Sequence, residues 1–204
     1  MNEQTSGVAA IVLAAGASRR FGASKQLWPW GTGTMLTAVV DTALASTARP
    51  VVVVLGHRAA DCQVALGDRF VTVVINSAWE EGQSTSVRAG LSALPDDVSA
   101  ALFLLADQPA IRVDTVEAVI RCYQVTRAPV VWPEVDGRRG NPVLFDRSLF
   151  GELQALRGDV GGRPVLEAHR ARAARVAVTD RAILLDIDTP ADIAGNTTPV
   201  TPEA

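Results

Sequence analysis

The segment from Val8 to Lys25 constrains the fold of this 204-residue chain more than any other. It opens with eight small or apolar residues, Val8–Ala15, which is typical of a strand buried on both faces of a parallel sheet. Two glycines and three cationic residues follow within ten positions: Gly16, Arg19, Arg20, Gly22 and Lys25. Glycines let backbone N–H groups approach an anion, and open α/β sheets bind ligands at the carboxyl ends of their strands. The segment therefore predicts a binding site for a nucleoside triphosphate.

The chain continues as an alternation of short apolar runs and helical patterns. The candidate strands are Val8–Ala14, Val51–Leu55, Val71–Ile75, Ala101–Leu105 and Val130–Trp132. Apolar residues recur at helical spacing in Met35–Ser46, Ala59–Leu66, Thr85–Leu94 and Thr115–Thr126. This alternation predicts an α/β fold, a Rossmann-like three-layer sandwich with a mostly parallel sheet covered by helices on both faces.

The last third of the chain is less regular. After the polar turn Glu134–Asn141, the run Val143–Phe145 is expected to return antiparallel beside the preceding strand. Further expected elements are two helices, Ser148–Arg157 and Pro164–Ala174, and two short strands, Val176–Val178 and Ile183–Ile187. We expect a single domain over residues 1–196. Its nucleotide-binding half would cover about 8–110, its acceptor half about 111–196, and residues 197–204 would form a flexible tail.

Composition excludes several classes of protein. A net charge of −3 and an isoelectric point near 5.4 argue against a general nucleic-acid binder. The longest apolar runs are far too short to span a bilayer, and no cationic region precedes the first of them as in a secretory signal. Cys62 and Cys122 lack metal-ligand spacing, so free thiols are expected. These observations predict a cytoplasmic protein that binds neither nucleic acid nor membrane.

The spacing within the cationic segment differs from two common phosphate motifs. In a Walker loop lysine directly follows glycine, whereas here two residues separate Gly22 from Lys25. The dinucleotide pattern GxGxxG is also absent, because Ser18 stands where its second glycine would be. The simplest alternative is a solvated basic loop, which the coincidence of glycines and three cations at a strand end disfavours.

The pattern L-A-A-G-x-S-x-R-x-G-x-x-K at Leu13–Lys25 resembles the signature of MobA-type nucleotidyltransferases. Within that superfamily the chain is most similar to the molybdenum cofactor cytidylyltransferases. The resemblance extends over Gly82–Leu91, Leu105–Pro109, Gly137–Phe145, Gly158–Leu166 and Asp186–Ile193. It covers nearly all of the chain up to about residue 195.

This resemblance implies transfer of CMP from CTP to molybdopterin with Mg²⁺ as cofactor. It implies CTP because guanylyl-transferring relatives carry glycine where this chain has Ala15. The expected catalytic residues are Arg20, Lys25 and Asp107. The expected nucleotide-binding residues are Leu13, Ala14, Ala15, Gly16, Ser18, Arg20, Gly22, Lys25, Ser84 and Ser86. A molybdenum hydroxylase, or the chaperone that matures it, is a possible protein partner.

The expected metal ligands are Asp107 and Asp188. Asp107 ends an apolar run at the same sheet edge as Gly16, where a carboxylate can hold Mg²⁺ against phosphate oxygens. Its alternative role is a helix cap. Asp186 and Asp188 would point to one face of an extended segment, so either suits the second position, and the resemblance favours Asp188. Capping of the final helix is the alternative for this pair.

Hydroxyls and arginines complete the candidate site. Ser84, Thr85 and Ser86 suit a pyrimidine edge or ribose, and one of them is expected to cap the following helix. The resemblance places Arg139, Asn141 and Arg163 around the acceptor, although Arg138 and Arg139 could simply form a charged hairpin tip.

Three other functions remain open from the sequence. The first keeps the nucleotidyltransferase site but uses GTP, or a sugar phosphate as acceptor. The second is an NADPH-dependent oxidoreductase of the same fold, which the lack of GxGxxG and the presence of Asp107 and Asp188 disfavour. The third is a non-catalytic nucleotide-binding chaperone.

Overall fold

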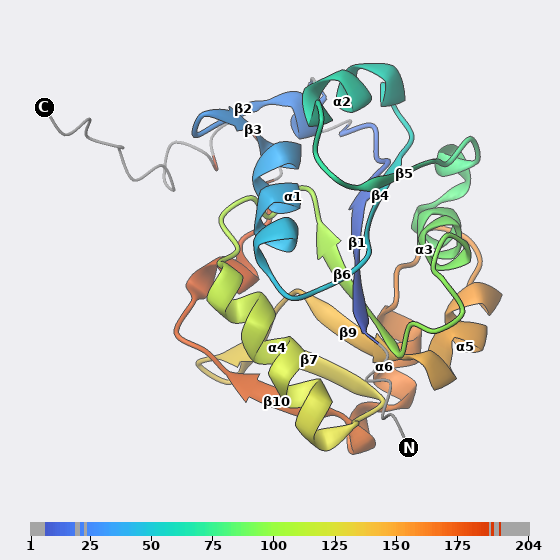
Figure 1. Cartoon of the computed structure of the whole chain (residues 1–204), viewed down its shortest axis with the longest axis vertical. Coiled ribbons are helices and arrows are strands. Elements are labelled where there is room, and N and C mark those ends of the chain that lie inside the picture. The colour runs from blue at the N-terminus through green and yellow to red at the C-terminus, as the bar shows by residue number, and fades with distance from the viewer. Residues whose placement is uncertain (1–6, 19–20, 23, 188, 190–191, 193–204) are drawn as a thin grey trace, which may run out of the picture.

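The computed structural model describes residues 7–18, 21–22, 24–187, 189 and 192, and these form a sheet between two layers of helices (Figure 1). Within the described residues the sheet has eight strands. Their order is β10 (Ala174–Ala177), β7 (Val130–Val135), β9 (Val143–Asp146), β6 (Ala100–Leu105), β1 (Val8–Ala14), β4 (Val51–Leu55) and β5 (Thr72–Ile75), with β8 (Arg138–Arg139) paired to β7.

Most of the sheet is parallel, as predicted. β1 lies between β4 and β6 and is parallel to both, with Leu13 opposite Val54 on one side and Leu105 on the other. β9 is antiparallel to β7, the preceding long strand, which confirms the expected reversal. It also pairs antiparallel with β6, so it lies between β6 and β7 in the sheet.

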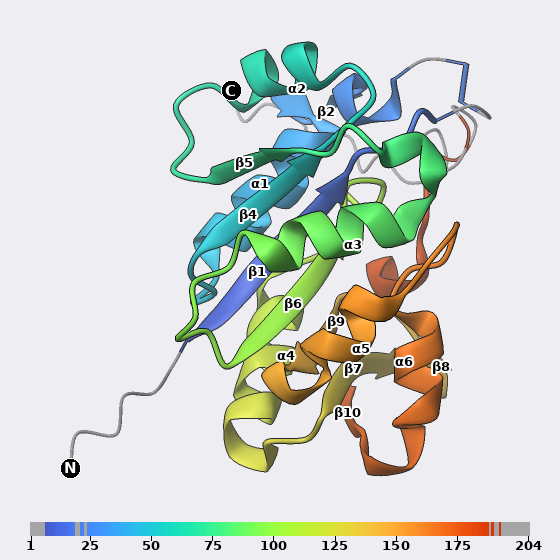
Figure 2. The same ribbon diagram turned by 90° about the vertical axis from the view of Figure 1, so that its right-hand side faces the viewer.

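The two faces of the sheet carry separate helical layers (Figures 1 and 2). One layer contains α1 (Met35–Ala45), α2 (Ala59–Leu66) and α4 (Val113–Thr126), and the other contains α3 (Gln83–Ser92), α5 (Phe150–Ala155) and α6 (Arg163–Ala168). Side chains of β1 alternate between the two cores, with Ala10 and Val12 on the α1 side and Ile11 on the α3 side. This confirms the three-layer α/β architecture.

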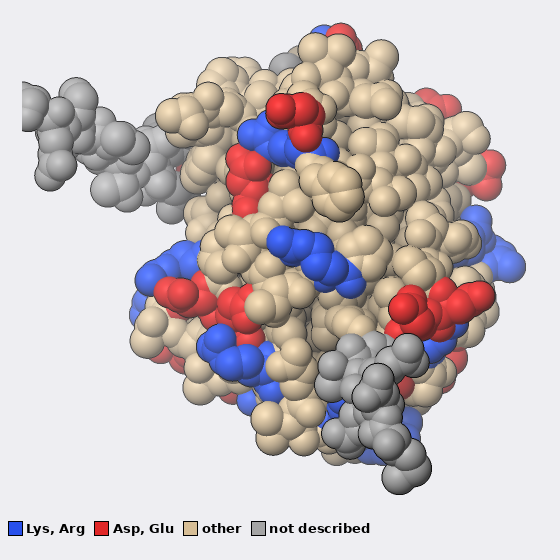
Figure 3. Space-filling model, viewed as in Figure 1, with Lys and Arg blue, Asp and Glu red and all other residues tan. Residues whose placement is uncertain are grey.

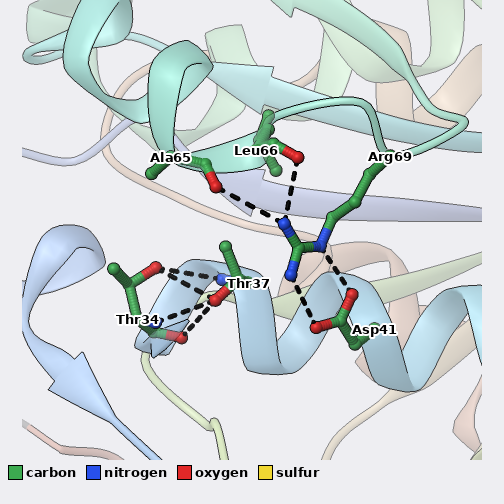
Figure 4. A network of polar contacts seen from close by, with 6 residues as sticks. All are labelled: Thr34, Thr37, Asp41, Ala65, Leu66 and Arg69. Carbon is green, nitrogen blue, oxygen red and sulfur yellow. Dashed lines mark hydrogen bonds and ion pairs between the residues drawn. The ribbon is translucent and has the colours of Figure 1, made fainter. Parts of the chain in front are cut away.

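Polar contacts dock the segment between α2 and β5 onto α1 (Figure 4). The hydroxyl groups of Thr34 and Thr37 form a reciprocal capping box at the start of α1. Arg69 binds the carboxylate of Asp41 with two nitrogens, at 2.6 and 2.9 Å, and donates to the carbonyls of Ala65 and Leu66 at the end of α2. One guanidinium therefore joins both helices and satisfies carbonyls that a helix end leaves without partners.

The prediction of a strand over Ile183–Ile187 is wrong. Residues Arg181–Leu184 instead form a 3₁₀-helical turn. Asp180 caps this turn, since its carboxylate accepts hydrogen bonds from the N–H of Ala182 at 3.0 Å and the hydroxyl of Thr115 at 2.8 Å.

Smaller elements differ from expectation mainly in length. α5 and α6 are shorter than predicted because 3₁₀ turns at Arg147–Leu149 and Arg170–Arg172 flank them. A two-stranded hairpin, β2 (Pro29–Trp30) and β3 (Gly33–Thr34), precedes α1. Cys62 and Cys122 are free thiols, as predicted. The expected tail at 197–204 lies outside the described residues.

On the surface over α1 and α4, acidic and basic side chains are interspersed (Figure 3). Such mixing is usual for a solvated protein surface. In the part of the chain that the structure describes, no helix has both the length and the hydropathy needed to cross a membrane.

Candidate active site

Lys25 and Asp107 meet at the carboxyl edge of the parallel sheet. β1 and β6 are parallel neighbours, so the segments that follow them leave the sheet on the same side. Asp107 lies two residues beyond β6, and Lys25 begins a 3₁₀ turn after the glycine-containing segment that follows β1. Lys25 Nζ lies 3.0 Å from Asp107 Oδ2, and their side chains are only 12% and 28% exposed. The structure thus brings together the two residues on which the predicted site depends.

Gln26 shapes the segment after β1, although sequence reasoning did not single it out. Its buried amide donates to the carbonyls of Ala14 and Gly16, at 3.3 and 2.5 Å. Its amide oxygen accepts from the hydroxyls of Ser18 and Ser24, at 3.3 and 3.0 Å. These four contacts tie the two ends of the segment together beside Lys25. A glutamine between Lys25 and an apolar residue gives no local signal of this role.

A cavity of about 440 Å³, here called the first cavity, opens beside this ion pair. It is lined by eight of the predicted site residues: Leu13, Ala14, Ala15, Gly16, Ser18, Lys25, Ser86 and Asp107. Gly22 and Ser84 are not among its lining residues, and Ser84 is fully buried. Arg19, Arg20 and Asp188 lie outside the described residues. The structure therefore gathers most of the predicted nucleotide site around one cavity.

Several further residues line the first cavity without having been predicted. They are Phe21, Gln26, Trp79, Gln83, Leu105, Ala106 and Asp159. Trp79 packs edge-to-face on His57, with ring centroids 5.4 Å apart. A Cβ on Gly56 would lie 2.8 Å from the Cβ atoms of both Ala15 and Trp79, so this glycine allows the cavity walls to approach each other.

The hydroxyl-rich segment begins α3 in a different way from that predicted. The N-cap of α3 is Gly82, whose φ is +113° and which has no side chain of its own to cap the helix. The expectation that a hydroxyl caps this helix is therefore wrong. The hydroxyls of Thr85 and Ser86 instead accept hydrogen bonds from the buried amide of Asn76, at 2.8 and 3.0 Å. This holds Ser86 at the cavity wall.

A second cavity of about 620 Å³ adjoins the first and contains all three predicted acceptor residues, Arg139, Asn141 and Arg163. Its apolar lining includes Phe103 and Phe145. The two cavities are adjacent, because four residues line both of them: Leu13, Gln83, Leu105 and Asp159.

The shared wall is formed where the glycine-rich loop Gly158–Gly162 packs on the start of α3. Asp159 accepts a hydrogen bond from the N–H of Gln83 at 3.2 Å, and Gly158 accepts one from the N–H of Ser84 at 3.3 Å. A Cβ on Gly82 would lie 2.4 Å from the backbone of Gly158, so only glycine allows this approach. Gln83 and Asp159 are therefore positioned between the two cavities.

Arg139 is a half-buried cation at the second cavity. Burial lowers the pKa of its guanidinium, and the positive charges of Arg163 and Arg170 lower it further, against the opposing charge of Glu167. Glu167 forms its ion pair with Arg170, at 3.1 Å. A half-buried cation that lies near two other cations favours an anionic or strongly polar ligand.

Asp107 has the features of a ligand for a divalent cation. Its Oδ2 faces Lys25, whereas its Oδ1 is buried and accepts no hydrogen bond from the described residues. A buried carboxylate oxygen without a donor is costly, and a hard cation such as Mg²⁺ would satisfy it. The N–H of Ile187 donates to the Asp107 carbonyl at 3.0 Å, and Asp186 accepts from Gln108 at 2.7 Å. The segment that leads to position 188 thus lies beside Asp107.

A mostly parallel α/β sheet with a cation, a carboxylate and two adjacent cavities at its carboxyl edge is typical of enzymes that transfer a group from a nucleotide. The family model described as the MobA-like NTP transferase domain matches residues 10–174. The chain belongs to this family, and by family and fold it is a MobA-like nucleotidyltransferase.

Known proteins similar to the chain carry more than one activity. It is 30% identical to the nicotine blue oxidoreductase of Paenarthrobacter nicotinovorans, with 89% of this chain and 92% of that protein covered. It is 27% identical to the molybdenum cofactor cytidylyltransferase of Escherichia coli strain K12, with 92% and 94% covered. A crystal structure of Rv0371c from Mycobacterium tuberculosis H37Rv with manganese is 27% identical, with a TM-score of 0.81 over 93% of this chain and 97% of that one.

Proposed function

We propose that this protein transfers CMP from CTP to the terminal phosphate of molybdenum-bearing molybdopterin. The products would be pyrophosphate and the molybdopterin cytosine dinucleotide cofactor. The observation that carries the proposal is the Lys25–Asp107 pair at a first cavity that shares a wall with a second. The similarity to the cytidylyltransferase of Escherichia coli supports this choice of reaction.

The reaction requires little chemistry from the protein beyond positioning. An oxygen of the acceptor phosphate forms a bond to the α-phosphorus of CTP, and the bond from that phosphorus to the bridging oxygen of pyrophosphate breaks. A phosphate monoester has a second pKa near 6 and is mostly dianionic at pH 7. The nucleophile therefore needs no general base, and catalysis rests on alignment and charge neutralisation.

Each cavity has a distinct part in this reaction. Lys25 and the backbone N–H groups near Gly16 would bind the triphosphate and offset the charge that develops on the departing pyrophosphate. Arg20 is expected to assist them. Arg139, Asn141 and Arg163 would hold the acceptor in the second cavity. The shared wall at Gln83 and Asp159 would keep the two substrates side by side.

Asp107 would hold Mg²⁺, and the donor set fits this ion because one of its carboxylate oxygens is buried and accepts no hydrogen bond from the residues that the structure describes. Asp188 is proposed as the second ligand. The interaction of Asp186 with Gln108 favours a supporting role for Asp186. When bound, the ion would neutralise charge on the phosphate oxygens. The manganese in the Rv0371c crystal structure is consistent with a divalent cation in this fold.

A second candidate is an NADPH-dependent oxidoreductase, favoured by the 30% identity to nicotine blue oxidoreductase. A third keeps the transferase chemistry but uses GTP or a sugar phosphate. Ala15 lines the first cavity, and a methyl group at this position would limit the room for a base, which favours cytosine.

The direct test is incubation with molybdopterin and each Mg·NTP, with pyrophosphate release and product mass as readouts. We expect pyrophosphate and a cytosine dinucleotide from CTP alone. A guanine product would change the assigned base. Oxidation of NADPH without pyrophosphate release would replace the proposal with the oxidoreductase.

A further inference from the structure

The junction of the two cavities is the place where the two substrates of a transfer reaction would meet. The residues that line both cavities are Leu13, Gln83, Leu105 and Asp159. The two leucines carry no polar side-chain atom, and the ionised carboxylate of Asp159 accepts hydrogen bonds but donates none. Among the described residues at this junction, the side-chain amide of Gln83 is therefore the group that can donate hydrogen bonds to a phosphate.

The cationic side chains of the described site lie to either side of this junction. Lys25 lines the first cavity only, whereas Arg139 and Arg163 line the second cavity only. In the proposed reaction these cations would hold the triphosphate on one side and the acceptor on the other. The phosphorus that is attacked would then lie beside Gln83, because the new bond forms between the two cavities.

The start of α3 holds Gln83 in a fixed position. Its N–H donates to Asp159 Oδ1 at 3.2 Å, and the N–H of Ser84 donates to the carbonyl of Gly158 at 3.3 Å. Figure 2 shows the loop that contains Gly158 extending from α5 and α6 towards this helix end. A Cβ on Gly161 would lie 2.8 Å from Gln83 Oε1 and 3.4 Å from its Nε2, so the carboxamide packs directly against this glycine.

We propose that Gln83 is a catalytic residue whose side-chain amide donates a hydrogen bond to a non-bridging oxygen of the transferred phosphoryl group. In this step an oxygen of the acceptor phosphate bonds to the α-phosphorus of CTP, and the bond from that phosphorus to the bridging oxygen breaks. The electron pair of the broken bond leaves with pyrophosphate, and no proton transfer is needed. A preorganised donor at the position where charge develops stabilises the transition state more than the bound substrate. The inference rests on the proposed function and adds the group that contacts the reacting phosphorus centre.

Steady-state kinetics of Gln83→Ala, with pyrophosphate release from CTP and molybdopterin as the readout, tests this role. We expect kcat to fall about 10²-fold, because one preorganised donor is lost. Equilibrium binding should leave the Kd for CTP within about threefold of the wild-type value. Gln83→Glu keeps the shape of the side chain but replaces the donor with a negative charge, so its kcat should fall at least as far. A wild-type kcat, or a loss of CTP affinity as large as the loss of kcat, would overturn the inference.

Gly161→Ala moves the same amide without removing it. The added methyl group would lie 2.8 Å from Gln83 Oε1, so the flexible end of this side chain must shift. We expect kcat to fall on the order of tenfold, because catalysis depends on the position of the donor. In the Gln83→Ala background the same substitution should have no further effect, since its target is absent. Additive losses in the double variant would overturn the placement of the amide that the inference requires.

Gln154→Ala is the matched control. Gln154 is an exposed glutamine on α5 and lines neither the first nor the second cavity. This variant should keep the wild-type kcat and both KM values, and thermal denaturation should show that every variant is folded. If the wild-type protein releases no pyrophosphate with any Mg·NTP, the proposed function fails and this inference fails with it. If the wild-type protein transfers CMP and Gln83→Ala does so at the same kcat, only the role of Gln83 is refuted.

Discussion

The substitution Asp107→Asn should separate the catalytic role of the carboxylate from its contribution to stability. It preserves the shape of the side chain but removes the negative charge that faces Lys25 at 3.0 Å and that would hold the metal. The variant should therefore remain folded while losing most of its activity.

The effects of Asp107→Asn on stability and on turnover differ in size. At an effective dielectric constant near 20, charges 3.0 Å apart attract by about 5–6 kcal/mol, and desolvation offsets most of this gain. With side chains 12% and 28% exposed, we expect a net loss of about 1–2 kcal/mol in the free energy of unfolding, or roughly 2–8 °C in Tm. Loss of one preorganised charge contact should lower turnover about 10²–10³-fold.

Pyrophosphate release with CTP and molybdopterin measures the activity, and a Mn²⁺ titration measures metal binding without turnover. Asp61→Asn is the control, because Asp61 forms an exposed ion pair with Arg58 at 2.8 Å and lines neither cavity. The control should keep both activity and Mn²⁺ affinity. A folded Asp107→Asn protein that retains more than about a tenth of wild-type turnover would refute the assigned role.

Three further predictions concern other parts of the molecule. Arg139→Gln should raise the KM for the acceptor about tenfold without changing the KM for CTP. Steady-state kinetics with each substrate varied in turn measures both constants, and an unchanged KM for the acceptor would contradict the prediction. Gly90→Ala should cost about 1–3 kcal/mol, because its Cβ would lie 2.6 Å from Ile11 Cγ2; an unchanged urea midpoint would contradict this. Burial opposes ionisation of Asp146, but hydrogen bonds, including one from Tyr123 at 2.6 Å, outweigh it and lower its pKa. Asp146→Asn should therefore be less stable than the wild-type protein at pH 7, and the difference should shrink as the pH falls below about 4, in urea unfolding at each pH.

Local pattern accounts for the framework of the site. The uninterrupted apolar run of β1 predicts a doubly buried strand, and parallel pairing then brings the ends of β1 and β6 to one edge. The meeting of Lys25 and Asp107 follows from that rule, although they are 82 residues apart. The same reasoning failed at Ile183–Ile187, where the side-chain cap from Asp180 stabilises a 3₁₀ turn in place of a strand.

The fold class, the family and the end of the sheet that binds ligands are all encoded in short stretches of the chain, because periodicity reports which faces are buried. The shared wall of the two cavities is not encoded in this way. Asp159 contacts Gln83 across 76 positions, and the glycines at 82 and 158 permit it only once α3 and the loop are packed together. Contacts of this kind depend on how finished elements fit against each other in space, which no local pattern contains.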